Sequence, residues 1–316
     1  MLENPFVFKN GWEIEDFLYG NNSICGFSIQ GKEKVKTKKF LSIPAFYYGN
    51  KEKTLIEDIM VIEQYAFQGY GLKSVEIPRT ILKIGEGAFE DNEIEYTIFH
   101  GHLNNLRKLA FKNNPEMKLF LANPRTNLED LEKVKELFTN IKILDLGQLE
   151  MIVFFPDSLF CGMGLKEIIL PPNLMEIGKY ALGNNKFKKI DFPNTLKTIG
   201  ICSFMNNELQ SVEIPDSVEK IMSEAFTNNK ITKIVFSKNQ KDISFRSFKR
   251  NRIEELDIPD NIEFIDDEAF LYNPIKKIGL GNNIKKIGQR AFPETKEVEE
   301  ALFRYALKNK EVWIWK

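Results

Sequence analysis

Apolar residues recur along this chain with a period of 22 residues. A phenylalanine marks almost every period, and the anchor positions are Phe67, Phe89, Phe111, Phe138, Phe160, Leu182, Phe204, Phe226, Phe248, Phe270 and Phe292. Nine of the ten steps are 22 residues long, and the step from Phe111 to Phe138 is 27. Because only 26 of the 316 residues are phenylalanine, chance does not explain this series. The period therefore predicts a structural unit, here called a coil, repeated along the chain.

Each coil carries the pattern of a short strand that buries one face. An apolar residue stands five positions before nearly every anchor, and two more stand eight and ten positions after most of them, as in Val75/Ile77 and Val212/Ile214. A spacing of two between branched apolar residues is typical of a strand with one buried face. Proline follows several of these pairs directly, as at Pro215, and its missing N–H ends the strand.

An asparagine stands three positions after most anchors, at Asn92, Asn114, Asn185, Asn207, Asn229, Asn251 and Asn273. Asparagine tolerates the left-handed backbone conformation, and its side chain bonds to nearby backbone, so we expect each coil to turn there. A single coil cannot bury its apolar edge, whereas stacked copies can. The sequence therefore predicts a solenoid with a continuous parallel sheet along one side.

Four segments show the repeat most clearly: IPRTILKIGEGAFEDN, FPNTLKTIGICSFMNN, IPDSVEKIMSEAFTNN and IPDNIEFIDDEAFLYN. This pattern resembles the BspA-like leucine-rich repeat family over roughly residues 55 to 292. The resemblance implies an α/β fold, a right-handed leucine-rich repeat solenoid with a parallel β-sheet on the concave face and short helical turns on the other side. It also implies binding and not catalysis. Members are commonly bacterial cell-surface or secreted proteins that attach to host matrix proteins, cells or other microbes, although proteins with the same repeat also occur without export signals.

The ends of the chain depart from the period, which predicts a solenoid over 55–292 capped at both ends. Residues 1–54 are predicted to form a strand-rich N-terminal cap. Its basic run at 32–39 indicates a solvated hairpin or loop, or alternatively a patch for an acidic partner. Residues 293–316 are predicted to form a C-terminal cap made of a helix and an edge strand. The helix carries an apolar stripe of Val298, Leu302 and Tyr305.

The five-residue insertion predicts a helix near 123–138. It begins with Thr126 and Glu129 in the spacing of a capping box. Apolar residues then recur at helical spacing, at Leu128, Leu131, Val134 and Phe138. Insertions in solenoids lie on the surface and often serve binding, although neutral drift places them there too.

Positions seven and nine after each anchor are predicted to point out from the sheet, because eight and ten point inward. Two neighbouring coils bring aromatic and apolar residues together on this outer face. We predict that the partner-binding residues are Tyr96, Ile98, His100, Lys118 and Phe120. In the alternative, the register slips at these irregular coils and turns the side chains inward. Counting from Phe138 places Asp145 and Gly147 at the outward positions of the following coil.

Composition favours no catalytic chemistry. With 44 basic and 45 acidic residues, the chain has no global positive field for nucleic acid or anionic membranes. Cys25, Cys161 and Cys202 lie far apart, which indicates neither a disulfide framework nor a zinc site. His100 and His102 would share a strand face, but the sequence offers no third metal ligand. Motifs for nucleotide binding, zinc proteolysis or serine hydrolysis are absent from the sequence. We therefore predict no enzyme activity, no cofactor and no bound metal.

The sequence thus predicts a non-catalytic protein-interaction module with a protein ligand and no small-molecule substrate. By resemblance it is a bacterial surface or secreted adhesin-like protein. The alternative is a cytoplasmic scaffold or regulatory binding protein, which is favoured if Met1 is the native start, because the first residues lack the pattern of a secretory signal. A third hypothesis, a carbohydrate-binding or hydrolytic protein, requires a pair of carboxylates in a cleft, and the sequence shows none.

Overall fold

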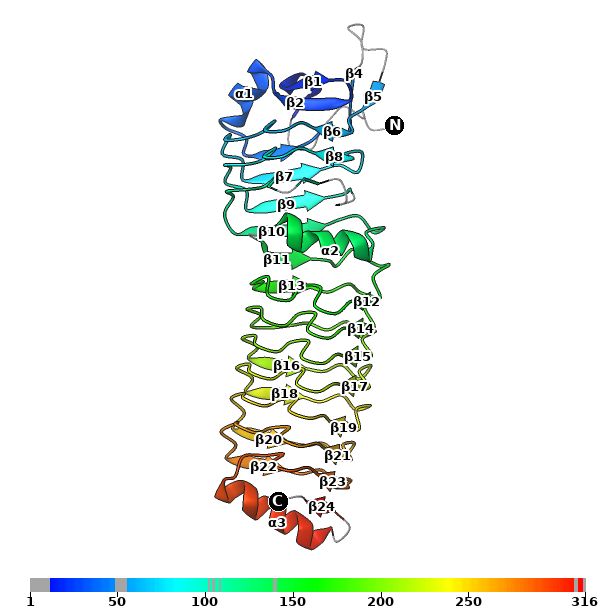
Figure 1. Ribbon diagram of the computed structural model, residues 1–316, viewed down its shortest axis with the longest axis vertical. Helices are drawn as coiled ribbons and strands as arrows, with labels where there is room; N and C mark the ends of the chain where they lie inside the picture. The colour runs from blue at the N-terminus through cyan, green and yellow to red at the C-terminus, as the bar shows by residue number, and fades with distance from the viewer. Residues whose placement is uncertain are drawn as a thin grey trace. The chain divides into compact units, whose positions relative to one another are not determined.

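The computed structural model describes residues 12–48, 56–101, 103, 106–107, 109–138, 141–309 and 312–314. The chain divides into two compact units, Met1–Met151 and Ile152–Lys316. Each unit is a stack of coils that contribute short strands to two parallel arrays (Figure 1). The strands that follow the anchors form the main sheet, and the strands that precede them form the lateral sheet.

In the described part of the first unit, a short 3-10 helix and a hairpin precede the repeating path. Its main sheet pairs β3, β7, β9, β10 and β11 in parallel, and its lateral sheet pairs β2, β6 and β8 in parallel. The elements are the 3-10 helix η2 (Ile14–Asp16), β1 (Phe17–Gly20), β2 (Ser23–Phe27), α1 (Ile29–Val35), β3 (Phe40–Ser42), β4 (Phe46–Tyr48), β5 (Ile56–Asp58), β6 (Val61–Ile62), β7 (Ser74–Ile77), β8 (Lys83–Ile84), β9 (Tyr96–Phe99), β10 (Met117–Leu121), α2 (Leu128–Leu137) and β11 (Ile141–Asp145).

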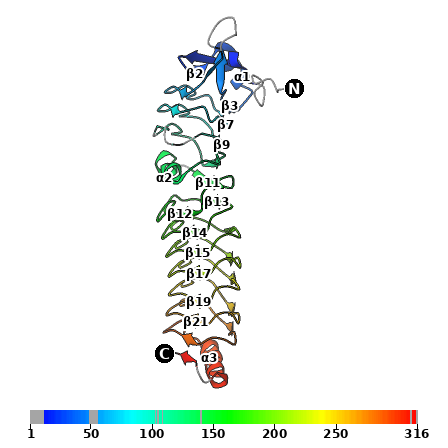
Figure 2. The same ribbon diagram turned by 90° about the vertical axis from the view of Figure 1, so that its right-hand side faces the viewer.

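The second unit is more regular and ends in a helix. Figure 2 shows its lateral strands one above another. They pair in parallel as β12–β14–β15–β17 and β19–β21–β23–β24, and main-sheet pairs are β16–β18 and β20–β22. The elements are β12 (Phe154–Phe155), β13 (Glu167–Ile169), β14 (Glu176–Ile177), β15 (Thr198–Ile199), β16 (Ser211–Glu213), β17 (Lys220–Ile221), β18 (Lys233–Val235), β19 (Asp242–Ile243), β20 (Glu255–Asp257), β21 (Phe264–Ile265), β22 (Lys277–Gly279), β23 (Lys286–Ile287), α3 (Lys296–Lys308) and β24 (Trp313–Ile314).

The predicted anchors form the core of both units. All eleven anchor side chains are at most 5% exposed. In the second unit the rings of successive phenylalanine anchors stack, and the centroids of Phe204, Phe226, Phe248 and Phe270 are 5.4 to 5.6 Å apart. Burying one such ring contributes about 2 to 3 kcal/mol before entropy is subtracted, so the series of anchors is a main source of cohesion.

The asparagines three positions after the anchors link neighbouring coils. Asn251 is buried, and its amide donates to the carbonyls of Phe226 and Phe248 at 2.9 and 3.0 Å, while its oxygen accepts from the Ile231 N–H at 3.0 Å. The predicted bonding to local backbone is confirmed. The left-handed conformation lies one residue earlier, as at Arg250 with φ 55°, because the asparagine itself faces the core.

The predicted fold class, a leucine-rich repeat solenoid, is confirmed, and the side opposite the main sheet differs in detail. In the regular coils that the structure describes, hydrogen-bonded turns and two-residue lateral strands such as β14 and β15 take the place of helical turns. The residue five positions before most anchors, usually isoleucine, supplies the inward residue of these strands, as with Ile177 and Ile199.

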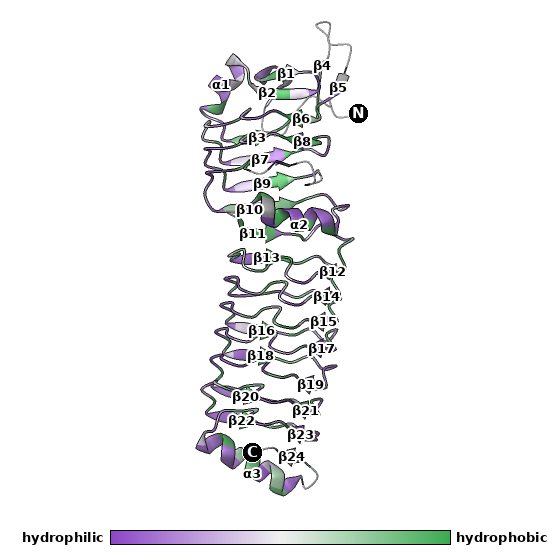
Figure 3. Ribbon diagram, in the orientation of Figure 1, coloured by the Kyte–Doolittle hydropathy of each residue, from purple (hydrophilic) through white to green (hydrophobic). Residues whose placement is uncertain are grey.

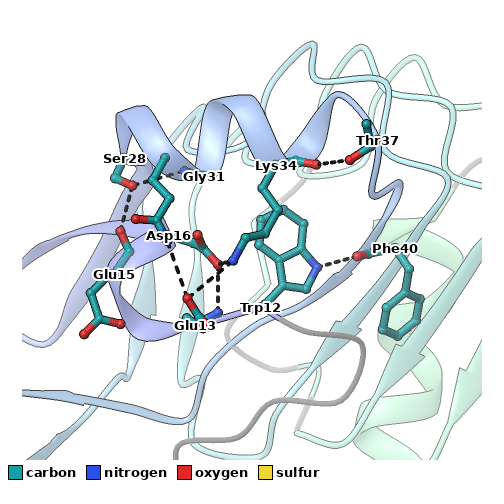
Figure 4. A network of polar contacts seen from close by, with 10 residues as sticks. Trp12, Glu13, Glu15, Asp16, Ser28, Gly31, Lys34, Thr37 and Phe40 are labelled. Carbon is teal, nitrogen blue, oxygen red and sulfur yellow. Dashed lines mark hydrogen bonds and ion pairs between the residues drawn. The ribbon is translucent and has the colours of Figure 1, made fainter.

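A polar network holds together the N-terminal elements of the first unit (Figure 4). Buried Asp16 forms an ion pair with Lys34 of α1 and accepts from the backbone N–H of Glu13 at 2.8 Å. The Trp12 indole donates to the Phe40 carbonyl at 2.6 Å, which connects this network to β3. The first half of the basic run 32–39 is helical, because Ser28 caps a helix that ends at Val35, and the prediction of a hairpin or loop was wrong there. Residues 36–39 form a turn and a short irregular segment, as a loop would.

The cap boundaries at residues 54 and 292 stay predictions, and two features bear on them. Because β2 and β3 pair in parallel with β6 and β7, residues 23–42 already follow the path of a coil. At the other end, α3 buries Val298 and Tyr305, two residues of its predicted stripe, and β24 adds to the lateral sheet as the predicted edge strand.

Candidate functional site

The outer face of the main sheet in the first unit carries the predicted partner-binding residues. In the parallel pair β9–β10, Tyr96 lies beside Lys118 and Ile98 beside Phe120. The alternate residues Thr97 and Leu119 are 0% and 1% exposed, so they point into the core. Tyr96 is 37% exposed, Lys118 is exposed, and Ile98 and Phe120 are half-buried. The strand alternation is therefore as predicted, and the inward alternative is wrong for these coils. Partner binding itself stays a prediction.

His100 follows β9 directly and contacts a carboxylate on the neighbouring strand. Its Nε2 lies 3.0 Å from Oε1 of Glu76, and the Ser42 hydroxyl donates to Oε2 of the same carboxylate at 3.3 Å. The glutamate therefore stands between the serine and the histidine. A nucleophile needs its base within hydrogen-bond reach, so this arrangement does not form a catalytic triad. It orients His100 at one edge of the apolar surface.

The strand β11 enters this surface in a register that the sequence did not predict. Ile143 pairs with Lys118, and Asp145 pairs with Phe120, with a bulge next to Met117. The expectation of Asp145 and Gly147 at positions seven and nine was therefore wrong by two residues. The reason is that β11 begins at Ile141, three residues after the anchor Phe138, whereas β9 begins at Tyr96, seven residues after the anchor Phe89.

Ile143 is the residue that sequence reasoning missed. It is half-buried and lies on the outer face, next to the predicted residues. A signal was present, because the pair at positions eight and ten after Phe138 contains polar Gln148, whereas Leu144 and Leu146 are two apart and both 0% exposed. We call the apolar surface formed by Tyr96, Ile98, Phe120 and Ile143 the outer patch.

Charges surround the outer patch. Partial burial raises the pKa of Tyr96, and the carboxylates of Asp145 and Glu76 raise it further. The Tyr96 hydroxyl therefore stays protonated and available as a hydrogen-bond donor. Lys118 provides a positive charge on the same face. The patch thus combines apolar contact area with donors and acceptors at its rim.

The inserted helix α2 is tied to the segment that follows His100. Asp130 is fully buried, and its carboxylate accepts from the backbone N–H of Leu103 at 2.9 Å. The same side chain forms a capping box with Asn127. The predicted box of Thr126 and Glu129 was wrong by one residue, because Asn127 caps the helix and Thr126 is buried.

Metal chemistry finds no support among the described residues. They contain no group of three or more histidine, cysteine, aspartate or glutamate side chains that could hold a metal ion. His102 lies outside the residues that the structure describes, so the prediction that His100 and His102 share a strand face is not tested. Within the same described ranges, no helix is long and apolar enough to cross a membrane.

Two carboxylates do meet in one groove, in the second unit, which the sequence had not revealed. Asp260 and Glu263 line an open polar groove of about 830 Å³, together with Asn282. A hydrogen bond from Lys285 lowers the pKa of Glu263. Asp260 accepts two hydrogen bonds from Asn282, at 2.8 and 3.1 Å. A glycosidase needs a general acid with a raised pKa, so the groove suits binding better than hydrolysis.

Coils of one period, each with an outward-facing strand and a buried phenylalanine, define a solenoid of the leucine-rich repeat class. The chain belongs to the BspA-type leucine-rich repeat family, whose model matches six copies over residues 39–144, 134–251 and 197–310. The resemblance seen in the sequence is thereby confirmed. No curated protein matches the chain.

Several solved structures match this chain at low sequence identity. A leucine-rich repeat protein from Bacteroides ovatus is 16% identical, with a TM-score of 0.41, over 98% of this chain and 100% of that chain. A leucine rich cell surface protein from Faecalibacterium prausnitzii is 14% identical, with a TM-score of 0.26, over 90% and 94% of the two chains. The pneumococcal vaccine antigen PcpA is 14% identical, with a TM-score of 0.28, over 95% and 96%.

Proposed function

We propose that this chain is a non-catalytic protein-interaction module that binds a protein ligand at the outer patch. Membership of a leucine-rich repeat family supports the class of function. The observation that carries the site is the outer patch itself, whose side chains face outward from three adjacent paired strands. In the second unit, by contrast, the outward main-sheet residues are mostly charged, as with Glu213, Lys233 and Glu255.

The geometry accounts for how such a surface binds. Tyr96 and Phe120 offer large, stiff contact areas, and aromatic side chains of this kind dominate the energetics of protein interfaces. The strands beneath them are fixed by parallel hydrogen bonds, so little conformational entropy is lost on binding. Lys118 and His100 stand at the rim, where they select a partner by charge and hydrogen bonding.

Comparison of variants tests this proposal. The full chain, a Y96A/F120A variant and a V235A control are immobilised and exposed to purified host matrix proteins and to extracts of the source cells. Val235 is 43% exposed on β18 at the equivalent outward position, so the control removes an apolar side chain from the same kind of surface. We expect a ligand that the control retains and the double variant loses. Equal capture by all three proteins would contradict the site.

The proposed location follows from family resemblance: a bacterial surface or secreted adhesin-like protein. The alternative is a cytoplasmic scaffold or regulatory binding protein with the same mode of binding. Fractionation of the source cells, with mass spectrometry of the mature N-terminus, separates the two. Recovery at the cell surface or in the medium supports the adhesin role, and recovery in the cytoplasm supports the scaffold.

A second candidate function is carbohydrate binding at the polar groove of the second unit. Its lining combines Asp260, Glu263 and the amides of Asn261, Asn282 and Asn283, which suit a ligand rich in hydroxyl groups. Titration calorimetry with neutral oligosaccharides tests this function. An N282A/N283A variant should lose any binding, and an absence of heat with every oligosaccharide would eliminate the function.

A further inference from the structure

The helix α3 covers the last coil of the second unit with one of its faces. Val298 is 1% exposed and Tyr305 is 8% exposed. The Tyr305 hydroxyl donates to the carbonyl of Gly281 at 2.7 Å and accepts from the backbone N–H of Ile284 at 3.2 Å. This face of the helix is therefore packed and its polar group is satisfied.

The opposite face of α3 carries two exposed apolar side chains. Phe303 is 67% exposed and Leu307 is 64% exposed, which makes them the most exposed large apolar side chains described in the second unit. They are four residues apart, so they lie side by side on one face of the helix. Figure 3 shows polar and apolar bands alternating along α3. Two large apolar side chains exposed together on one helix face are typical of an interaction surface.

A groove lies beside the exposed pair. It has a volume of about 580 Å³. Its apolar lining includes Ile287, Phe292, Leu302, Phe303, Ala306 and Ile314. Leu307 does not line the groove and projects next to it. One surface therefore carries both a projecting side chain and a recess, which is what a two-fold symmetric interface requires, because each copy presents the same patch to the other.

The charges along α3 also suit the pairing of two copies of this helix. The N-terminal half of the helix carries Lys296 and three glutamates, Glu297, Glu299 and Glu300, and is acidic on balance, while Arg304 and Lys308 make the C-terminal half basic. When two copies pack antiparallel, the acidic half of each helix faces the basic half of the other, and the helix dipoles oppose as well.

We propose that a second copy of this chain docks on α3, with the two helices antiparallel and Leu307 of each copy seated in the groove of the other. The contact area is confined to one helix and the adjoining groove, so we expect a weak dimer, with a dissociation constant on the order of 10 to 100 µM.

Sedimentation equilibrium of the full chain tests the dimer, at concentrations from about 1 µM to about 500 µM, which bracket the expected constant. The wild-type chain should pass from monomer to dimer, and F303E and L307E should weaken dimerisation at least tenfold. Tyr272→Glu is the matched control, because Tyr272 is 54% exposed in the same unit and does not line the groove beside α3. Far-ultraviolet circular dichroism confirms that each variant is folded.

Charge exchange tests the orientation. Arg304 and Glu300 already form an ion pair within one helix at 3.0 Å. The E300R variant should weaken the dimer, and E300R/R304E should restore it, because the exchange preserves pairing both within and between antiparallel helices. Three results would overturn the proposal: a wild-type chain that stays monomeric throughout, a dimer indifferent to both apolar variants, or a monomer that instead binds phosphatidylcholine–phosphatidylglycerol vesicles through Phe303.

Discussion

The side-chain amide of Asn229 donates to the carbonyl of Phe204, the anchor of the preceding coil, at 2.9 Å. It also donates to the carbonyl of its own anchor, Phe226, at 3.1 Å, and its oxygen accepts from the backbone N–H of Leu209 at 3.1 Å. One buried side chain therefore satisfies backbone groups of two consecutive coils that no water can reach.

Replacing Asn229 with alanine should destabilise the second unit by about 2 to 4 kcal/mol, because a buried N–H and two buried carbonyls lose their partner. Urea denaturation monitored by circular dichroism measures this change in the free energy of unfolding.

The neighbouring residue supplies the control. Asn228 is exposed and has a φ of 58°, and its side chain bonds only to Asn206 of the preceding coil among the contacts described. Glycine adopts this backbone conformation without strain, so N228G should change stability by less than about 1 kcal/mol. Equal losses in the two variants would mean that the turn conformation matters and the buried hydrogen bonds do not.

Outward residues of the outer patch should contribute little to stability. Y96A and F120A should each cost about 1 to 2 kcal/mol, since part of each ring remains in water and its removal leaves no closed cavity. L119A, from the inward side of the same strand, should cost about 2 to 5 kcal/mol. Thermal and urea unfolding of the three variants measure the difference. A loss in Y96A or F120A as large as that in L119A would place these aromatic rings in the core.

Stability should depend on pH through Glu268. Hydrogen bonds from Arg246 and Lys249 lower the pKa of this carboxyl from 4.5 to about 2. Because the folded pKa lies below the unfolded one, the stabilisation is fully present above about pH 5 and is lost as the pH falls toward 2. E268Q should therefore cost about 1 to 2 kcal/mol at pH 7, allowing for partial solvation.

The difference in the free energy of unfolding between wild type and E268Q should shrink steadily between pH 5 and pH 3. Urea titrations at several pH values measure it. E219Q is the matched control. Glu219 pairs with Lys197 at 3.3 Å, and both side chains are well exposed, so its loss should cost less than about 0.5 kcal/mol. A pH-independent effect of E268Q would exclude the charge as the source.

The inserted helix should depend on Asp130. D130A removes the capping box and leaves the Leu103 N–H unpaired, so we expect a loss of about 2 to 3 kcal/mol. Hydrogen exchange should rise in the peptide that covers α2. Glu129 is exposed in the same helical turn, and E129A should leave exchange nearly unchanged. Unchanged exchange in D130A would show that the packing of Leu131 and Val134 alone holds the helix.

Much of this fold follows from two periodicities. The 22-residue step locates the anchors, and the two-residue alternation after each anchor separates inward Leu119 from outward Lys118 and Phe120. Alternation is reliable here because one face of each strand must enter a close-packed core.

Other features escaped the sequence for physical reasons. A lateral strand has two residues and only one inward side chain, such as Ile177, so it leaves no alternation to detect. The length of the insertion does not say how many residues stand before and after the anchor Phe138, and the register of Ile143 depends on that division. Thr126 and Asn127 are both good capping residues, and the choice between them follows from which one is buried.

The buried asparagines have a consequence for how such a chain changes over generations. Each one bonds to its own coil and to the coil before it, at sequence separations that repeat from copy to copy, as with Asn207, Asn229 and Asn251. Deleting or duplicating one whole period in the second unit leaves every remaining asparagine with the same set of partners. Unequal recombination can therefore lengthen or shorten that unit in steps of one coil while the outer patch, encoded upstream, is left untouched.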